Sequence, residues 1–112
     1  MNAVDVVQRQ LEAYNARDLP RFVACYGDSV QVFRPPSGDP AIAGKAAFSD
    51  FYATQRFHLP ALRAEVVNRI VLGNKVIDHE RVFGVRAQAF EVAVVYEVSA
   101  GLIQAVWFFQ GE

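Results

Sequence analysis

Val76-Ile77-Asp78-His79-Glu80-Arg81-Val82-Phe83-Gly84 places four ionisable residues in a row between apolar ends. The turn signal Gly73-Asn74 comes just before it, so the stretch is typical of the second arm of a β-hairpin. Side chains alternate between the two faces of a strand, so the two acids share one face and the histidine and arginine share the other. Two carboxylates on one face of a central strand cost free energy unless water, a cation or a ligand compensates them. The pattern therefore indicates a candidate site.

The second half of the chain is predicted to be a sheet built around this hairpin. It divides into long, valine-rich segments that are separated by short turns. Consecutive strands with short links favour an antiparallel meander. The predicted strands are residues 62–72, 75–84, 90–99 and 102–110.

The first half of the chain is predicted to be mainly helical. Apolar residues in 3–16 recur at three- and four-residue spacing, and Asn2 can cap this helix. Asp18 can cap a second, short helix, which we expect to end at Gly27. A short strand over 30–33, a proline-rich loop over 34–40 and a third helix over about 45–57 follow.

Helices come first and strands second, so the predicted fold class is α+β. We expect three N-terminal helices packed in a curved, mostly antiparallel sheet. Strands this long must curl around the helices to bury both apolar faces, which gives a cone with an open end. At 112 residues the chain is expected to form a single domain, residues 1–112.

Composition narrows the class of partner and the compartment. The formal net charge is −1, so no electrostatic field favours nucleic acid or an acidic membrane. No apolar run approaches the roughly 20 residues that a membrane span needs. The chain has one cysteine, Cys25, and no secretory signal is recognised at its start. We therefore expect a cytoplasmic protein without nucleic-acid or membrane partners.

Four segments carry a resemblance to a known family. They are Tyr-Asn-Ala-Arg-Asp-Leu at 14–19, Tyr-Gly-Asp-Ser-Val at 26–30, Gly44 with Phe51-Tyr52, and Gly-Leu-Ile-Gln-Ala-Val-Trp at 101–107. With them, nearly the whole chain resembles the nuclear transport factor 2-like superfamily, in its SnoaL-like and ketosteroid-isomerase-like branch. The resemblance implies a cone with an interior cavity and a homodimer through the sheet face. It does not fix the function, because the fold hosts isomerases, hydrolases, cyclases and plain binders.

The catalytic residues of ketosteroid isomerases are not matched at the aligned positions. Where those enzymes carry an aspartate before a proline, Arg34 precedes Pro35 here. The tyrosine and protonated aspartate of their oxyanion hole align with Gln10 and Ala93, and an alanine side chain cannot donate a hydrogen bond. The resemblance therefore implies a retained cavity with different chemistry in it, and steroid Δ-isomerase activity by that mechanism is not expected.

Asp78 and Glu80 are the candidate catalytic residues. The same alignment turns both toward the cavity, where one could be ionised and the other held neutral, as general acid/base catalysis requires. The alternatives are exposure at the cone mouth or pairing with an arginine, of which the candidates are Arg34, Arg56 and Arg69. Glu91 and Glu97, on the next strand, are weaker candidates for the same cavity.

The candidate ligand-binding residues are Tyr14, Arg34, Tyr52 and Trp107. Hydroxyl and indole N–H groups can donate to a ligand, and the arginine can bind a carboxylate or keto oxygen. The competing interpretation is that the aromatic residues are plain core and the arginine is solvated. The opposite strand face, with His79, is expected at a dimer contact, but a one-residue error in register would make His79 the pocket base instead.

No metal-ligand spacing, phosphate loop or cofactor motif is recognised, so we expect neither a metal nor a cofactor. The expected function is a pocket for a small, mostly apolar molecule that bears a carbonyl, with isomerase- or cyclase-like general acid/base chemistry. Its volume should be roughly a few hundred Å³, the range typical of ligand sites. The alternatives are a non-catalytic binding module that uses the same cavity, and a dimerisation domain whose cone is filled.

Overall fold

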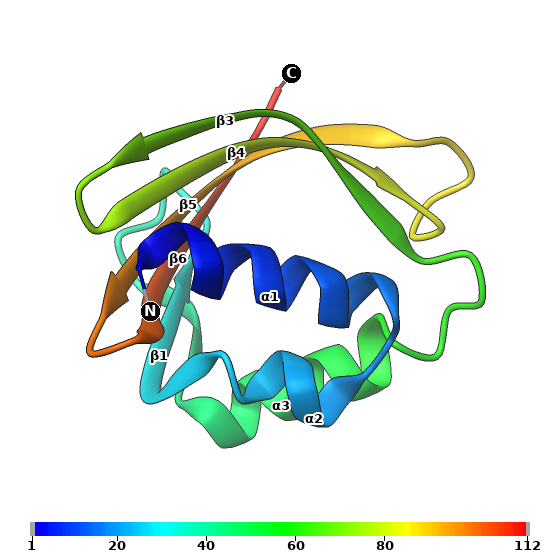
Figure 1. Ribbon diagram of the computed structural model, residues 1–112. Coiled ribbons are helices and arrows are strands. Elements are labelled where there is room, and N and C mark those ends of the chain that lie inside the picture. The colour runs from blue at the N-terminus through cyan, green and yellow to red at the C-terminus, as the bar shows by residue number, and fades with distance from the viewer. Residues whose placement is uncertain (1, 112) are drawn as a thin grey trace.

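The computed structural model describes residues 2–111 and shows helices packed under one face of a curved, unclosed sheet (Figure 1). The sheet has six strands in the order β2-β1-β6-β5-β4-β3. The predicted α+β class is confirmed. Among residues 2–111, no helix combines the length and the apolar character needed to cross a bilayer.

The helices are α1 (Ala3–Asn15), α2 (Leu19–Val23) and α3 (Lys45–Gln55). The predicted caps of α1 and α2 are confirmed: the Asn2 side chain accepts from the Asp5 N–H, and the Asp18 side chain accepts from the Arg21 N–H.

The second helix ends earlier than predicted. It stops at Val23 instead of continuing to Gly27, because Tyr26 already pairs with Ile103 in the sheet. The Ile103 N–H donates to the Cys25 carbonyl at 2.9 Å, which fixes this change of direction.

The strands are β1 (Tyr26–Phe33), β2 (Pro40–Ala43), β3 (Arg63–Leu72), β4 (Lys75–Phe83), β5 (Phe90–Ser99) and β6 (Leu102–Gln110). The antiparallel meander from β3 to β6 is confirmed. β1 joins β6 in parallel, and β2 pairs antiparallel with β1. The sequence did not predict β2, because Pro40 reads as a loop residue; an edge strand can accommodate it.

Strand β3 contains a bulge that changes which side chains face inward. Val66 pairs with Glu80 and Asn68 pairs with His79, so Val67 has no partner between them. A bulge inserts one extra residue and reverses the alternation beyond it. Arg69 therefore lies opposite Asp78 and on the same face, whereas strict alternation from Val66 would have turned it outward.

The core lies between the inner face of the sheet and the helices. Val76, Val94 and Val106 of the sheet are buried against aromatic residues of α2 and α3. Phe22 and Phe48 stack with ring centroids 5.6 Å apart and an interplanar angle of 10°. These rings form the floor on which the candidate site is built.

Candidate functional site

A cavity of about 80 Å³ lies between the aromatic floor and the inner face of β4, β5 and β6. It is smaller than the few hundred Å³ expected, because phenylalanine and tyrosine rings from both layers occupy most of the space. Its polar lining comes from Gln10, Arg34, Arg56, Glu80, Tyr96 and Gln110, together with the hydroxyls of the other tyrosines in the walls. The hollow therefore combines apolar walls with a few polar groups, as ligand sites do.

The central strand presents its acids inward, as the alignment with ketosteroid isomerases implies. Asp78 is 0% exposed and Glu80 is 6% exposed. His79 lies on the outer face and pairs with Glu91. The alternative in which His79 is the pocket base is therefore wrong in this register.

Two other expected acids lie outside the cavity. Glu91 bonds to His79 on the outer face, and Glu97 forms an ion pair with Lys75 at 2.9 Å. Glu91 lies opposite Arg81 and Glu97 lies opposite Lys75 in the sheet, and the side chains of Arg81 and Lys75 are on the outer face of β4. Glu91 and Glu97 thus do not add acid to the cavity.

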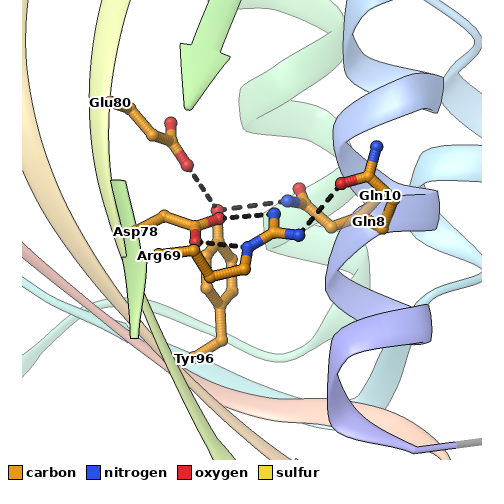
Figure 2. Close-up of polar contacts among 6 residues, drawn as sticks. All are labelled: Gln8, Gln10, Arg69, Asp78, Glu80 and Tyr96. Atoms are coloured by element: carbon orange, nitrogen blue, oxygen red, sulfur yellow. Dashed lines mark hydrogen bonds and ion pairs between the residues drawn. The ribbon is translucent and has the colours of Figure 1, made fainter. Parts of the chain in front are cut away.

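Arg69 holds Asp78 through two hydrogen bonds (Figure 2). The guanidinium Nε donates to Oδ1 at 2.7 Å, and Nη2 donates to Oδ2 at 2.9 Å. Nη1 donates to the Gln8 side chain at 3.0 Å. Because both carboxylate oxygens are occupied and Asp78 does not line the cavity, its surroundings give it a structural role in place of the expected catalytic one.

Glu80 is held at one oxygen by a chain of buried hydrogen bonds, part of which Figure 2 shows. The Tyr96 hydroxyl donates to Glu80 Oε2 at 3.2 Å and accepts from the Gln10 amide at 3.2 Å. The Gln10 carbonyl in turn accepts from the Tyr26 hydroxyl at 2.9 Å. Every donor points along the chain toward Glu80.

The second oxygen of Glu80 remains available to the cavity. Within residues 2–111, Oε1 has no hydrogen-bond partner, and no fully buried polar side-chain atom lacks one. Oε1 therefore keeps exposed surface, and Glu80 is the carboxyl group among the cavity-lining residues. This oxygen can hold or release a proton without breaking the bond from Tyr96.

The environment of Glu80 raises its pKa to about 7. Burial is the largest cause, and the negative charge of Asp78 is the next. The hydrogen bond from Tyr96 and the charge of Arg69 act in the opposite direction. Burial raises the pKa of Tyr96 well above its ordinary value, so its hydroxyl stays a neutral donor. Glu80 thus titrates near neutral pH.

Tyr14 and Tyr52 both line the cavity, where the sequence placed them. In the described part of the chain their hydroxyls have no hydrogen-bond partner, so the absence of buried unpaired groups means that each hydroxyl keeps some exposed surface. Burial raises the pKa of Tyr52 to about 12 and raises that of Tyr14 as well. Both are therefore neutral hydrogen-bond donors available to a ligand.

Arg34 lines the cavity, but Trp107 does not. Val106 and Phe108 face inward, so the residue between them faces outward. The Trp107 ring stacks on Phe33 with centroids 5.4 Å apart and an interplanar angle of 14°. The expected ligand contact of Trp107 is thus replaced by a place on the outer face.

The sequence analysis missed the roles of Gln10, Tyr26 and Tyr96. A signal for Gln10 was present, since it follows Val6 by four residues on the buried side of α1, where a polar residue needs a partner. Tyr96 carried no signal beyond its inward alternation with Val94. Among residues 2–111, no three His, Cys, Asp or Glu side chains converge in a way that could hold a metal ion.

Residues 7–106 match the family described as the SnoaL-like domain. The chain belongs to this family. No curated protein matches the sequence. The fold is similar to that of an uncharacterised cystatin-fold protein from Novosphingobium aromaticivorans, at 22% identity over 98% of this chain and 99% of that one, with a TM-score of 0.87.

Two further solved structures share the fold of this SnoaL-like domain. A nuclear transport factor 2-like protein of unknown function from Cytophaga hutchinsonii has 13% identity, coverage of 99% and 91%, and a TM-score of 0.82. A candidate polyketide cyclase from Pseudomonas putida has 19% identity, coverage of 99% and 92%, and a TM-score of 0.71. At these identities the similarity establishes the fold, and the function has to be argued from the cavity.

Proposed function

We propose that this SnoaL-like domain is an enzyme that moves a proton on a small carbonyl compound, in isomerase- or cyclase-like chemistry. The observation that carries the proposal is Glu80: a buried, cavity-lining carboxyl with one anchored oxygen, one available oxygen and a pKa of about 7. Catalytic acids and bases work best when their pKa lies near the working pH.

Glu80 and the two free tyrosines have complementary roles in this proposal. Ionised Glu80 removes a proton from the carbon next to the carbonyl group, and the electrons move onto the carbonyl oxygen. The hydroxyls of Tyr14 and Tyr52 are available to donate to that oxygen as its negative charge develops. In a substrate with a double bond next to that carbon, protonated Glu80 then returns the proton to the far carbon of the double bond, which completes an isomerisation. In a substrate with a second carbonyl, the enolate carbon attacks that carbonyl and closes a ring, and protonated Glu80 gives its proton to the new alkoxide.

The size of the cavity limits the substrate. A volume of about 80 Å³ suits a compact molecule and is far below what a four-ring steroid needs. The similarity to a candidate polyketide cyclase agrees with carbonyl chemistry, and it supports no particular substrate.

Hydrogen–deuterium exchange at the α-carbon of small ketones tests the proposal. Acetophenone and acetylacetone are incubated with the protein in D₂O and followed by ¹H NMR. We expect exchange that rises with pH through about 7, as Glu80 ionises. Glu80→Gln should lower the rate by about 10²–10⁴-fold.

Glu91→Gln is the matched control, because it changes a carboxyl on the outer face. It should leave the exchange rate unchanged. Equal rates for the wild type and Glu80→Gln would overturn the catalytic role. Ketone binding without exchange would instead support the alternative function, a non-catalytic binding module that uses the same cavity.

We also propose that the chain forms a homodimer through the outer face of the sheet. One apolar row crosses five strands in register on that face, and its members are Ile70, Ile77, Val95, Trp107 and Phe33. Ion pairs that carry both signs flank the row, Lys75–Glu97 on one side and Arg81–Glu91 on the other. A face of this kind can be complementary to its own copy about a two-fold axis.

Sedimentation analysis of the wild type and of Val95→Glu tests the dimer. The wild type should sediment as a dimer and the variant as a monomer. A wild-type monomer at all accessible concentrations would contradict this proposal and leave the catalytic one untouched.

A further inference from the structure

Two arginines line the cavity together with Glu80 and are held over its aromatic walls. Arg34 follows β1, and its guanidinium lies 4.9 Å from the centroid of the Phe108 ring. Arg56 follows α3, and its guanidinium lies 5.1 Å from the centroid of the Phe51 ring. A guanidinium stacked on a ring uses its face, so its N–H edge stays free for an anion.

Neither arginine forms an ion pair with a carboxylate of residues 2–111, unlike Arg69 deeper inside. Arg56 donates from Nη1 to the Gln55 carbonyl at 2.9 Å, and its other N–H groups have no partner in the described chain. Both positive charges lower the pKa of the Tyr52 hydroxyl, against the larger effect of burial. The charges of Arg34 and Arg56 thus both reach the same hydroxyl group of the cavity wall.

The cavity therefore carries positive charge at the two arginines and negative charge beside Glu80. Arg34 and Arg56 supply positive charge that no carboxylate of residues 2–111 pairs with, whereas Glu80 lies beside the anion Asp78. Between the two arginines and Glu80, the walls are aromatic. An anionic group on a ligand would be attracted to the arginines and repelled from Glu80 once that carboxyl ionises.

We propose that the cavity binds a compact apolar carboxylate, such as an aryl-substituted keto acid, with its carboxylate on Arg34 and Arg56. Its ring lies among the phenylalanines, and its carbonyl lies within reach of Tyr14 and Tyr52. This orientation presents the carbon next to the carbonyl to Glu80. The part of the inference that concerns the reacting carbon rests on the proposed acid/base function, while the binding of the carboxylate does not.

Isothermal titration calorimetry with matched pairs of ligands tests the inference. The probes are benzoate, phenylacetate and 3-phenylpropanoate, each compared with its neutral primary amide. At least one acid should bind the wild type at least tenfold more tightly than its amide, and the preference should weaken as salt is raised. The double variant Arg34→Gln plus Arg56→Gln should lose the preference.

Arg86→Gln is the matched control variant. Arg86 also lies over a phenylalanine ring, 4.0 Å from the centroid of Phe90, but it donates to Gln110 and does not line the cavity. This variant should keep the full preference for the acid. A thermal melt of each variant verifies that the fold is intact.

The outcomes separate this inference from the proposed function. Equal affinity for acid and amide, no binding of any acid, or an acid preference that survives in the double variant would overturn the carboxylate site, even if ketones still exchange. Acid binding that depends on Arg34 and Arg56, together with no exchange in any substrate, would keep the carboxylate site and overturn the acid/base proposal. Glu80→Gln should retain acid binding in either case.

Discussion

Asp78 and Glu80 lie two residues apart on the same face of β4, and their neighbours give them opposite roles. The Asp78 carboxylate has a charged donor on each oxygen. The Glu80 carboxyl has one neutral donor on one oxygen and open space at the other. The two groups differ little in chemistry or burial, so the difference lies in what the adjacent strands supply.

The comparison shows that one buried acid shifts the pKa of the other. Arg69 keeps Asp78 in place, and the negative charge of Asp78 is the second largest cause of the raised pKa of Glu80. The pair therefore behaves as a fixed ion beside a titratable one, which is the arrangement that separates acid and base roles at neutral pH. Four experiments would break or sharpen this contrast.

The largest effect is expected at the fixed ion. Asp78→Asn leaves the guanidinium of Arg69, which is 18% exposed, without its counter-ion. We expect the free energy of unfolding to fall by about 3–5 kcal/mol, measured by urea denaturation. The double variant Arg69→Met plus Asp78→Leu should recover most of this loss, since an apolar pair needs no counter-ion. A loss below about 1 kcal/mol for Asp78→Asn would contradict the structural role.

The titratable acid should make stability depend on pH. The pKa of Glu80 is about 7 in the folded state against 4.5 for its ordinary value, so between these pH values the folded state binds more protons than the unfolded chain. The contribution of Glu80 is therefore complete below about pH 4.5 and is lost by about pH 7, a fall of about 3 kcal/mol.

Glu80→Gln provides the comparison for that pH profile. The variant should lack this fall, so it should be more stable than the wild type above pH 7. Urea denaturation of both proteins between pH 4 and pH 8 measures the difference. Parallel profiles over this range would show that folding does not shift the pKa of Glu80.

A smaller effect is expected from the neutral donor. Tyr96→Phe removes the hydrogen bond that lowers the pKa of Glu80, so this pKa should rise above about 7. It also removes the acceptor for the buried Gln10 amide, at about 1–3 kcal/mol of stability. Carboxyl ¹³C NMR titration measures the pKa. Tyr26→Phe, which changes only the far end of the chain of hydrogen bonds, should shift it less.

The smallest effect is expected on the other face of the strand. The side chains of His79 and Glu91 are 44% and 51% exposed. His79→Ala should change the unfolding free energy by less than about 1 kcal/mol and leave ketone exchange unaltered. Loss of exchange in this variant would mean that His79 reaches the cavity and that the inward face of β4 is assigned wrongly.

Much of the fold could be predicted from the sequence, because its local signals agree with one another. The strands of the meander and the caps at Asn2 and Asp18 follow from periodicity and turn chemistry, and the family resemblance implied the inward face of β4. The failures lie where tertiary pairing overrides a local signal. Pro40 was assigned to a loop although it begins edge strand β2, and Tyr26 was assigned to a helix although it pairs with β6.

The candidate site could be predicted only in part. Alternation puts Asp78 and Glu80 on one face and the resemblance turns that face to the interior, but neither says which of them meets an arginine. The sequence gives no reason to prefer one of Arg34, Arg56 and Arg69 as the partner. The bulge at Val67 brings Arg69 opposite Asp78. The prediction for Trp107 was wrong because it considered only the indole N–H as a ligand donor, whereas the alternation of β6 turns the ring outward.

The register of β3 beyond that bulge also has a consequence for how such domains can change. Inserting one residue between Asn68 and Arg69, with the pairing up to Asn68 kept, would place the new residue opposite Asp78 and turn the guanidinium to solvent, leaving two uncompensated acids inside. An insertion of a single codon, with every chemically active side chain kept, is thus enough to convert a hollow with one proton-exchanging group into one where two carboxyls compete for a proton. Reactivity here depends on chain length as well as on residue identity.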